Sequence, residues 1–247
     1  MPTPFTHLAI TQRLLADSGL PQPARALLDA ERGAFLLGGI APDAQMLCNL
    51  SREQTHFYSY ERPIDVHPWR AMLAHYPDLR QTDPAKRAFL AGYAAHLAVD
   101  EYWSLYMLRP HFVEREWGTR GQRFLMLHAL LITMDERDHA GLDPTLGDQM
   151  LEARPQGWLP FIDDDHLLQW GFLIYRQIMP GGASETLEIL SPRVGRTPED
   201  VRALLDSPER MQTDLWDHIP PALVSEIETG MFDHARAHLL EYLRESA

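Results

Sequence analysis

Several features that define large protein classes are scarce in this sequence. Its 247 residues include one cysteine, Cys48, which excludes an internal disulfide and cysteine-rich zinc sites such as ribbons and fingers. The 22 Lys and Arg residues stand against 35 Asp and Glu, giving a formal net charge of −13. Because no stretch concentrates the basic residues, a surface that follows the phosphates of nucleic acid is not expected. Any bound metal must therefore use histidine and carboxylate ligands.

Long apolar runs are also missing. The longest, from Phe124 to Met134, is interrupted by His128 and is too short to span a bilayer. The first residues, Met1-Pro2-Thr3-Pro4, contain neither the basic segment nor the apolar core of a secretory signal. These features predict a cytoplasmic protein with no integral membrane association.

Strand patterns are almost absent, whereas apolar residues recur every three to four positions. The sequence therefore predicts an all-α fold. With no internal repeat and no change of composition at its turns, residues 1–247 read as a single-domain, multi-helix bundle. The expected helices cover about residues 6–17, 23–39, 84–108, 119–139, 165–179, 198–206 and 221–244, and residues from about 41 to 64 are expected to be irregular but packed.

The helix expected from Pro84 has the clearest boundaries and also carries candidate chemistry. Asp83 is its expected N-cap, and Pro110 is expected to stop it. His96 and Asp100 are four residues apart, so they share one helix face with aromatic residues, and that face should be buried. A buried carboxylate needs a cation, hydrogen-bond donors or a metal. In a plain helical scaffold, His96 and Asp100 would simply bond to each other.

Three polar residues earlier in the chain extend this pattern. Each has an ordinary alternative role: His7 as a polar residue near a helix start, Asp43 as a turn residue after a proline, and His56 as a core filler among aromatics. Together with His96 and Asp100 they make three histidines and two aspartates within the first hundred residues. This ligand set suits zinc or a related divalent metal.

The order of these motifs resembles the zinc-dependent phospholipase C family, whose relatives include the S1/P1-type nucleases. Members are all-α and use up to three zinc ions to hydrolyse phosphodiester bonds. The resemblance covers about residues 1–105 and rests on Thr6-His7, Gly39-Ile40-Ala41-Pro42-Asp43, Thr55-His56 and Gly92-Tyr93-Ala94-Ala95-His96-Leu97-Ala98-Val99-Asp100. It implies a helical bundle of that type, one to three zinc ions or another divalent metal, and a small-molecule or lipid phosphoester as substrate.

The resemblance also implies roles for single residues. Asp43, His56, His96 and Asp100 would surround one metal, and Asp100 would bridge to a second metal held by His7. Asp43 would be the catalytic residue that positions or deprotonates the attacking water. The chemistry expected is metal-dependent hydrolysis of phosphate esters, as in a phospholipase C-like phosphodiesterase.

The chain departs from the family pattern at two places. Secreted members bind metal through an N-terminal Trp, whereas this chain begins Met1-Pro2, which leaves the second site short of ligands. The third zinc of the family uses a His-x-x-x-Glu pair, and the sequence contains none. A rebuilt third site could use His128, Asp135 and His139, which lie at i, i+7 and i+11 on one helix face.

Two further functions stay open. The chain could be a non-catalytic, helical metal-binding protein of the same fold. Alternatively, His234 and His238, at i and i+4, could combine with His56 as in the histidine triad of DinB-like metal-binding bundles. Arg236 and Glu241 lie close by in sequence and favour a solvated surface for that helix.

Overall fold

The computed structural model describes residues 1–80 and 83–246, and all its elements are helical. None of these described residues forms a strand, so the all-α prediction is confirmed. In chain order the elements are α1 (Pro4–Leu15), α2 (Gln22–Ala30), α3 (Arg32–Gly38), η1 (Ala41–Met46), α4 (Arg52–His56), α5 (Pro68–His75), η2 (Pro77–Leu79), α6 (Pro84–Trp103), η3 (Ser104–Glu114), α7 (Arg120–Ala140), α8 (Thr145–Met150), α9 (Asp164–Ile178), α10 (Thr186–Leu190), η4 (Ser191–Val194), α11 (Pro198–Leu205), α12 (Pro208–Met211), η5 (Gln212–Trp216) and α13 (Pro221–Glu245).

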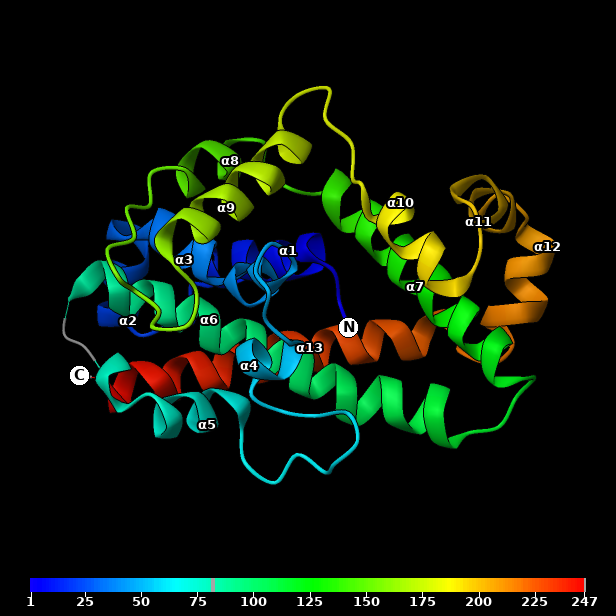
Figure 1. Cartoon of the computed structure of the whole chain (residues 1–247), viewed down its shortest axis with the longest axis horizontal. Coiled ribbons are helices and arrows are strands. Elements are labelled where there is room, and N and C mark those ends of the chain that lie inside the picture. Colours follow the sequence, from blue (N-terminus) through cyan, green and yellow to red (C-terminus); the bar gives the residue numbers. More distant parts are fainter. Residues whose placement is uncertain (81–82, 247) are drawn as a thin grey trace.

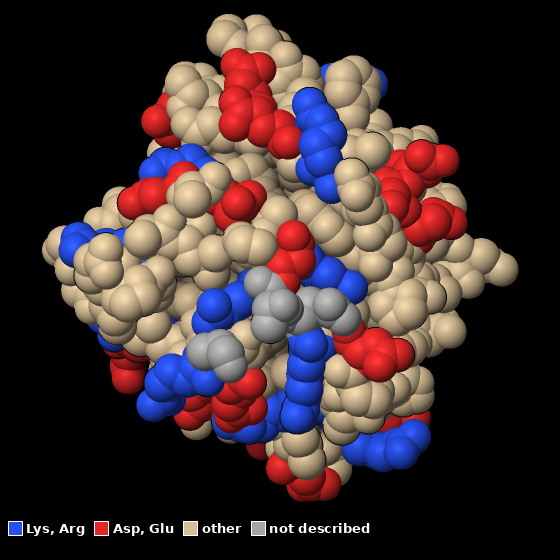
Figure 2. Space-filling view, turned by 90° about the vertical axis from the view of Figure 1, so that its left-hand side faces the viewer, with Lys and Arg blue, Asp and Glu red and all other residues tan. Residues whose placement is uncertain are grey.

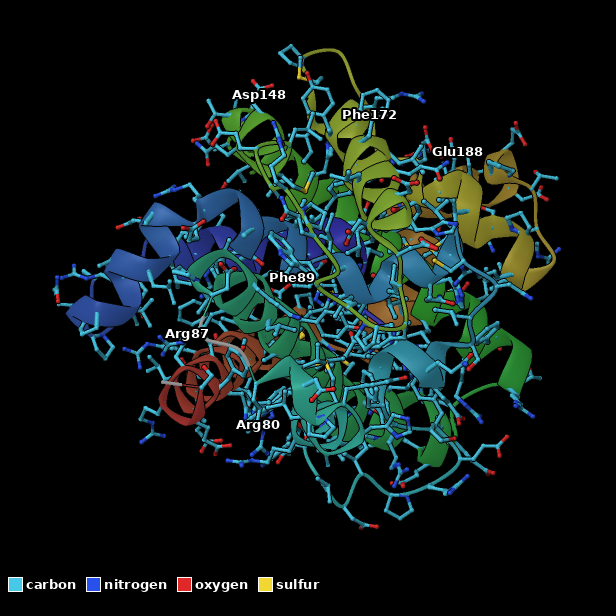
Figure 3. The ribbon with its side chains drawn as sticks, turned by 60° about the vertical axis from the view of Figure 1, so that its left-hand side comes forward. Arg80, Arg87, Phe89, Asp148, Phe172 and Glu188 are labelled. Carbon is cyan, nitrogen blue, oxygen red and sulfur yellow. The ribbon has the colours of Figure 1, made fainter. Side chains whose placement is uncertain are left out.

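Helix α6 is the centre of the packing. It lies against α13 on one side and α3 on another, and α5 also covers it (Figure 1). Every residue from Ala88 to Glu101 is buried. Figure 3 shows Phe89 in the interior, whereas Asp148 and Glu188 lie at the outer edge. The polar side chains of α6 therefore face neighbouring helices, and each must find its partners there.

Two glycines allow α3 and α6 to approach closely. A Cβ on Gly38 would lie 1.9 Å from the carbonyl oxygen of Phe89, and one on Gly92 would lie 2.2 Å from a carbonyl oxygen of α3. A larger residue at either position would push the helices apart. This contact brings the chain just after α3 against the middle of α6, where His96 lies.

The start of α6 follows the sequence prediction, but its end does not. The Asp83 side chain accepts a hydrogen bond from the backbone N–H of Lys86 at 2.8 Å, as expected of an N-cap. The helix then continues past Pro110, because it widens into the π-type helix η3. In a wider turn, the carbonyl that a proline ring would strike is displaced, so Pro110 does not stop the chain here.

Other differences concern short elements. The helix expected over about residues 23–39 is divided into α2 and α3 at Glu31, whose ψ of 38° is not helical. The expected irregular segment contains η1 and α4. The sequence did not predict α5, α8, α10 and α12, because helices of four to eight residues are too short to show a clear apolar periodicity.

The surface agrees with the charge pattern of the sequence. Figure 2 looks onto the end of the molecule near the C-terminus, where Lys and Arg alternate with Asp and Glu. No helix in the described part of the chain is both long and apolar enough to cross a membrane.

Candidate metal centre

Five predicted residues from four separate elements meet around one carboxylate. The Nε2 atoms of His7 (α1) and His56 (α4) each lie 3.3 Å from an oxygen of Asp100, and Nε2 of His96 lies 3.8 Å away. Asp43 (η1) joins them through its Oδ1, 3.5 Å from Nε2 of His56. We call these five side chains the Asp100 cluster.

The facing atoms of this cluster lack hydrogen-bond partners among the described residues. These atoms are Nε2 of His7, His56 and His96 and Oδ1 of Asp100. Each of the four residues is no more than 2% exposed. A buried polar atom without a partner costs about 1–3 kcal/mol. A metal ion would give all four an interaction at once, so the residues present fit a divalent metal.

The ring orientations of His56 and His96 are fixed by hydrogen bonds on the far side of each imidazole. Nδ1 of His96 lies 2.9 Å from the carbonyl oxygen of Gly39, and Nδ1 of His56 lies 2.9 Å from the Thr55 hydroxyl. The rings of His7 and His96 stack with centroids 3.6 Å apart and planes inclined by 8°. A proton on Nδ1 of His96 leaves its Nε2 lone pair directed into the cluster, which is how metal-binding histidines are usually held.

The atoms form two overlapping groups, each with the spacing of a metal site. His7, His96 and Asp100 make one, and Asp43, His56 and His96 make the other; within each, the ligand atoms lie within 4.8 Å of one another. His96 belongs to both groups. The cluster therefore offers ligands for one ion or for two adjacent ions.

Electrostatics set the protonation states that metal binding requires. Burial alone would raise the pKa of Asp100, but the adjacent His7 imidazole and the charge of Arg52 hold it well below its usual range. Burial and the neighbouring His7 lower the pKa of His96 to about 3, and burial and Arg52 lower that of His56. At neutral pH the carboxylate is ionised, and His56 and His96 are neutral.

Arg52 is a member of this region that sequence analysis missed. Its Nη2 lies 2.5 Å from Oδ2 of Asp100 and 3.0 Å from the Tyr58 hydroxyl. Its guanidinium also lies over the rings of Tyr58 and Tyr60, 4.8 Å from each centroid. The side chains of Arg52 and Asp43 are 23% and 20% exposed. These two residues mark the side on which the otherwise buried cluster opens to solvent.

The amino group of Met1 is also buried beside the cluster. Burial lowers its pKa to about 6, while the charges of Asp100 and Asp43 oppose that shift. The Sδ atom of Met1 lies 3.5 Å from the Tyr58 hydroxyl. A further nitrogen donor is therefore close to the ligands that the sequence predicted.

The structure does not bring His128, Asp135 and His139 together as a site. Nδ1 of His128 lies 2.8 Å from the carbonyl oxygen of Phe124, and Nε2 of His139 lies 2.7 Å from that of Gln177. Asp135 is fully buried and accepts a hydrogen bond from a serine of the segment before α10. Sharing a helix face is insufficient here, because eleven residues of helix rise about 16 Å, far beyond the reach of one ion.

His234 and His238 do not join His56, and the solvated surface expected for them is wrong for His238, which is 5% exposed. Instead, both lie beside His67 and Glu101, with ligand atoms within 4.8 Å of one another. The DinB-like triad is therefore absent from the described residues.

Comparison with known proteins supports the interpretation of the Asp100 cluster. Residues 6–124 match the family model described as zinc dependent phospholipase C. No curated protein and no solved structure matches the chain. The matched region contains all five residues of the Asp100 cluster and ends before α13. The resemblance seen in the motifs is confirmed over residues 6–124, which match the model of the zinc-dependent phospholipase C family.

Proposed function

We propose that the protein is a zinc-dependent phosphodiesterase of the phospholipase C type, with the Asp100 cluster as its metal centre. One observation carries the proposal: three imidazole nitrogens and a carboxylate oxygen are buried, face one another and lack hydrogen-bond partners in the described chain. The family match indicates zinc-dependent, phospholipase C-like function. His96 and Asp100 would hold metal with His7 on one side and with His56 and Asp43 on the other. Zinc bound there would polarise phosphate oxygens and acidify a bound water.

Asp43 is the proposed catalytic residue. Burial alone would raise its pKa, but the adjacent imidazoles of His56 and His96 lower the pKa to about 2. The side chain is therefore ionised at neutral pH, and it lies on the open side of the cluster. A carboxylate there can accept a hydrogen bond from the attacking water and orient it toward phosphorus. Its low basicity suits orientation better than full proton removal.

Arg52 is the proposed binding group for the phosphate. Its Nη2 is used by Asp100 and Tyr58, whereas its Nε and Nη1 make no hydrogen bond within the described chain. A planar guanidinium binds phosphate oxygens through parallel N–H donors. The rings of Tyr58 and Tyr60 hold it in place. The net charge of −13 disfavours docking on anionic bilayers, so the substrate is a zwitterionic lipid or a small soluble phosphodiester.

A non-catalytic metal-binding protein is the second candidate. Arg52 lies 2.5 Å from Oδ2 of Asp100, the residue expected to bridge two metals. A permanent cation at that oxygen favours a reduced centre with a single ion, which could serve stability alone.

Metal analysis combined with a hydrolysis assay tests the proposal. The protein is purified without chelator or metal-affinity resin, beside His96→Ala and a control, His166→Ala, whose ring is 36% exposed and pairs with Asp163 on the surface. We expect zinc in the wild type and the control, with zinc bound at the Asp100 cluster lost in His96→Ala. We also expect hydrolysis of a chromogenic phosphodiester that chelation abolishes and zinc restores.

The outcomes separate the two candidates. Zinc that depends on His96 without hydrolysis supports the non-catalytic protein. If zinc supplementation gives the wild type no more metal than His96→Ala, both proposals for the Asp100 cluster are overturned.

A further inference from the structure

A second group of histidines surrounds the residue next to Asp100. Glu101 follows it on α6, so its side chain points about 100° further around the helix, toward α5 and α13. Glu101 is 3% exposed. His67, at the N-cap of α5, and His234 and His238, one turn apart on α13, lie around it. We call these four side chains the Glu101 cluster.

The contacts within this cluster are short. Nδ1 of His67 lies 2.9 Å and 3.1 Å from the two oxygens of Glu101, and Nε2 of His234 lies 3.1 Å from Oε2. The ring of His238 lies 4.2 Å from the rings of both His67 and His234, centroid to centroid. One ligand atom from each of the four residues lies within 4.8 Å of the other three. Tetrahedral zinc with bonds of about 2.0–2.1 Å places its ligands roughly 3.3 Å apart, so modest side-chain rotation closes the site.

The donor set is that of a closed metal site. Three imidazoles and one carboxylate fill four positions, as in structural zinc sites, and histidines at i and i+4 can chelate from one helix face. Burial and the neighbouring His234 lower the pKa of His238 to about 4, so its ring is neutral at pH 7. Burial alone would raise the pKa of Glu101, but hydrogen bonds from His234 and His67 lower it and keep the carboxylate ionised.

The position of the cluster indicates its role. It lies where α5, α6 and α13 meet, beside Trp69, whose indole N–H lies 3.0 Å from Nδ1 of His238 and donates to it. The side chain of His67 is 42% exposed, which leaves a route for an ion from solvent. His67 and Glu101 lie within the matched region, whereas His234 and His238 lie beyond residue 124, so the match does not cover the complete site.

We propose that His67, Glu101, His234 and His238 form a structural site for a divalent transition metal of the zinc type, which fastens the C-terminal helix α13 to α5 and α6. The ion replaces the hydrogen bonds from His67 and His234 to Glu101, and these two rings then carry their protons on the nitrogens that face away from the ion. His238 becomes a ligand by giving up its Trp69 hydrogen bond at Nδ1 or by moving its Nε2 proton to Nδ1. This proposal does not depend on the function of the Asp100 cluster.

Zinc titration of a variant whose Asp100 cluster lacks His96, the ligand shared by both of its groups, isolates this site. His96→Ala, stripped of metal and then dialysed free of chelator, is titrated with zinc against a chromophoric competitor, beside His96→Ala/Glu101→Gln and His96→Ala/His234→Gln. The control is His96→Ala/His75→Gln, which changes an exposed histidine of α5. We expect the parent and the control to bind one zinc. The Glu101 and His234 double variants should lose more zinc affinity than the roughly 10–100-fold that follows when a residue that only hydrogen-bonds to a metal ligand is removed.

Thermal unfolding and fluorescence give two further readouts. Zinc should raise the melting temperature of His96→Ala and of the His75 control, but not that of the Glu101 or His234 double variants. Copper should quench the fluorescence that Trp69 contributes. This part of the quenching should be absent from His96→Ala/Trp69→Phe. His234→Gln keeps the Glu101–His67 contact, so it remains a test if Glu101→Gln does not fold. Equal zinc affinity in the parent and the His234 double variant would overturn the proposal.

Discussion

Asp100 and Glu101 follow each other on α6, and each is a buried carboxylate among three histidines. The two clusters differ in how their polar atoms are satisfied. In the Asp100 cluster the facing Nε2 atoms have no hydrogen-bond partner in the described chain. In the Glu101 cluster, His67 and His234 bond directly to the carboxylate. The Asp100 cluster is therefore arranged to bind a cation, whereas the polar atoms of the Glu101 cluster are already satisfied by hydrogen bonds.

This difference has consequences for metal affinity. An ion entering the Asp100 cluster gains ligands without displacing hydrogen bonds of the imidazole Nε2 atoms. An ion entering the Glu101 cluster must displace the hydrogen bonds from His67 and His234 to the carboxylate, which offsets part of its binding free energy. We therefore expect tighter metal binding at the Asp100 cluster than at the Glu101 cluster. Substitutions at the two neighbouring carboxylates test this difference between the clusters.

Asp100→Asn should have the largest effect. The change leaves the Arg52 guanidinium and three buried imidazoles without their shared anion. Removing one partner of a buried ion pair costs about 3–5 kcal/mol. We expect a loss of that size in the free energy of unfolding, measured with urea in chelator, together with loss of zinc from this cluster. Stability unchanged from the wild type would contradict the central position assigned to Asp100.

Arg52→Gln should mainly affect activity. On the proposed function, the guanidinium binds the phosphate as negative charge develops, and removing one such donor typically lowers kcat about 10²–10³-fold. Arg52→Lys should recover only part of the loss, because an ammonium group cannot form the two parallel hydrogen bonds. Zinc content measured in parallel shows whether the loss of rate comes from the metal. The Glu101 cluster has no arginine on its carboxylate among the described residues, so it is not expected to bind phosphate.

The long helices and the Asp100 cluster could be predicted because their signals are local. Apolar periodicity, an aspartate before a proline and the His96-x-x-x-Asp100 spacing all lie within one helix or one turn. Family resemblance supplied the link to His7, Asp43 and His56, which spacing alone could not provide. The end of α6 was missed because the tolerance of Pro110 depends on the widened turn of η3.

Contacts between distant segments could not be predicted in this way. Arg52 is 48 residues from Asp100, and nothing in its neighbourhood indicates that pairing. The Glu101 cluster depends on how α13 crosses α6, which no single helix encodes. Conversely, His128 and His139 share a helix face but not a site, because their rings bond to different carbonyl groups.

Glu101→Gln should cost less than Asp100→Asn. The neutral amide keeps the shape of the side chain but loses the charge that His67 and His234 bond to, and hydrogen bonds to charged groups are worth about 1.5–3 kcal/mol. We expect the free energy of unfolding, measured in chelator, to fall by roughly that amount. The control is Glu136→Gln, whose partly exposed pair with Arg202 should contribute less than about 1 kcal/mol. A loss equal to that of Asp100→Asn would remove the proposed contrast between the clusters.

Stability of the metal-free protein should fall as the pH is lowered. The pKa of His96 is lowered to about 3 and that of His238 to about 4, against about 6.5 in an unfolded chain. Between those values the unfolded chain binds more protons than the folded one, so the free energy of unfolding decreases from pH 6.5 downward. Urea unfolding in chelator at a series of pH values measures it. His238→Gln should make the free energy of unfolding depend less steeply on pH above pH 4. An unchanged slope would mean that other groups take up those protons on unfolding.

Asp135→Asn should have the smallest effect, and an opposite sign. Asp135 is fully buried, one of its oxygens has no partner in the described chain, and burial raises its pKa. A carboxyl group with a raised folded pKa favours the folded state at low pH and loses that contribution as the pH rises through that pKa. The amide stays neutral and can still accept the hydrogen bond from Ser184. We expect a higher free energy of unfolding at pH 8, a gain that vanishes at pH 3. Zinc content should not change, because His128 and His139 bond elsewhere, whereas a loss of zinc would restore the site that the sequence suggested on α7.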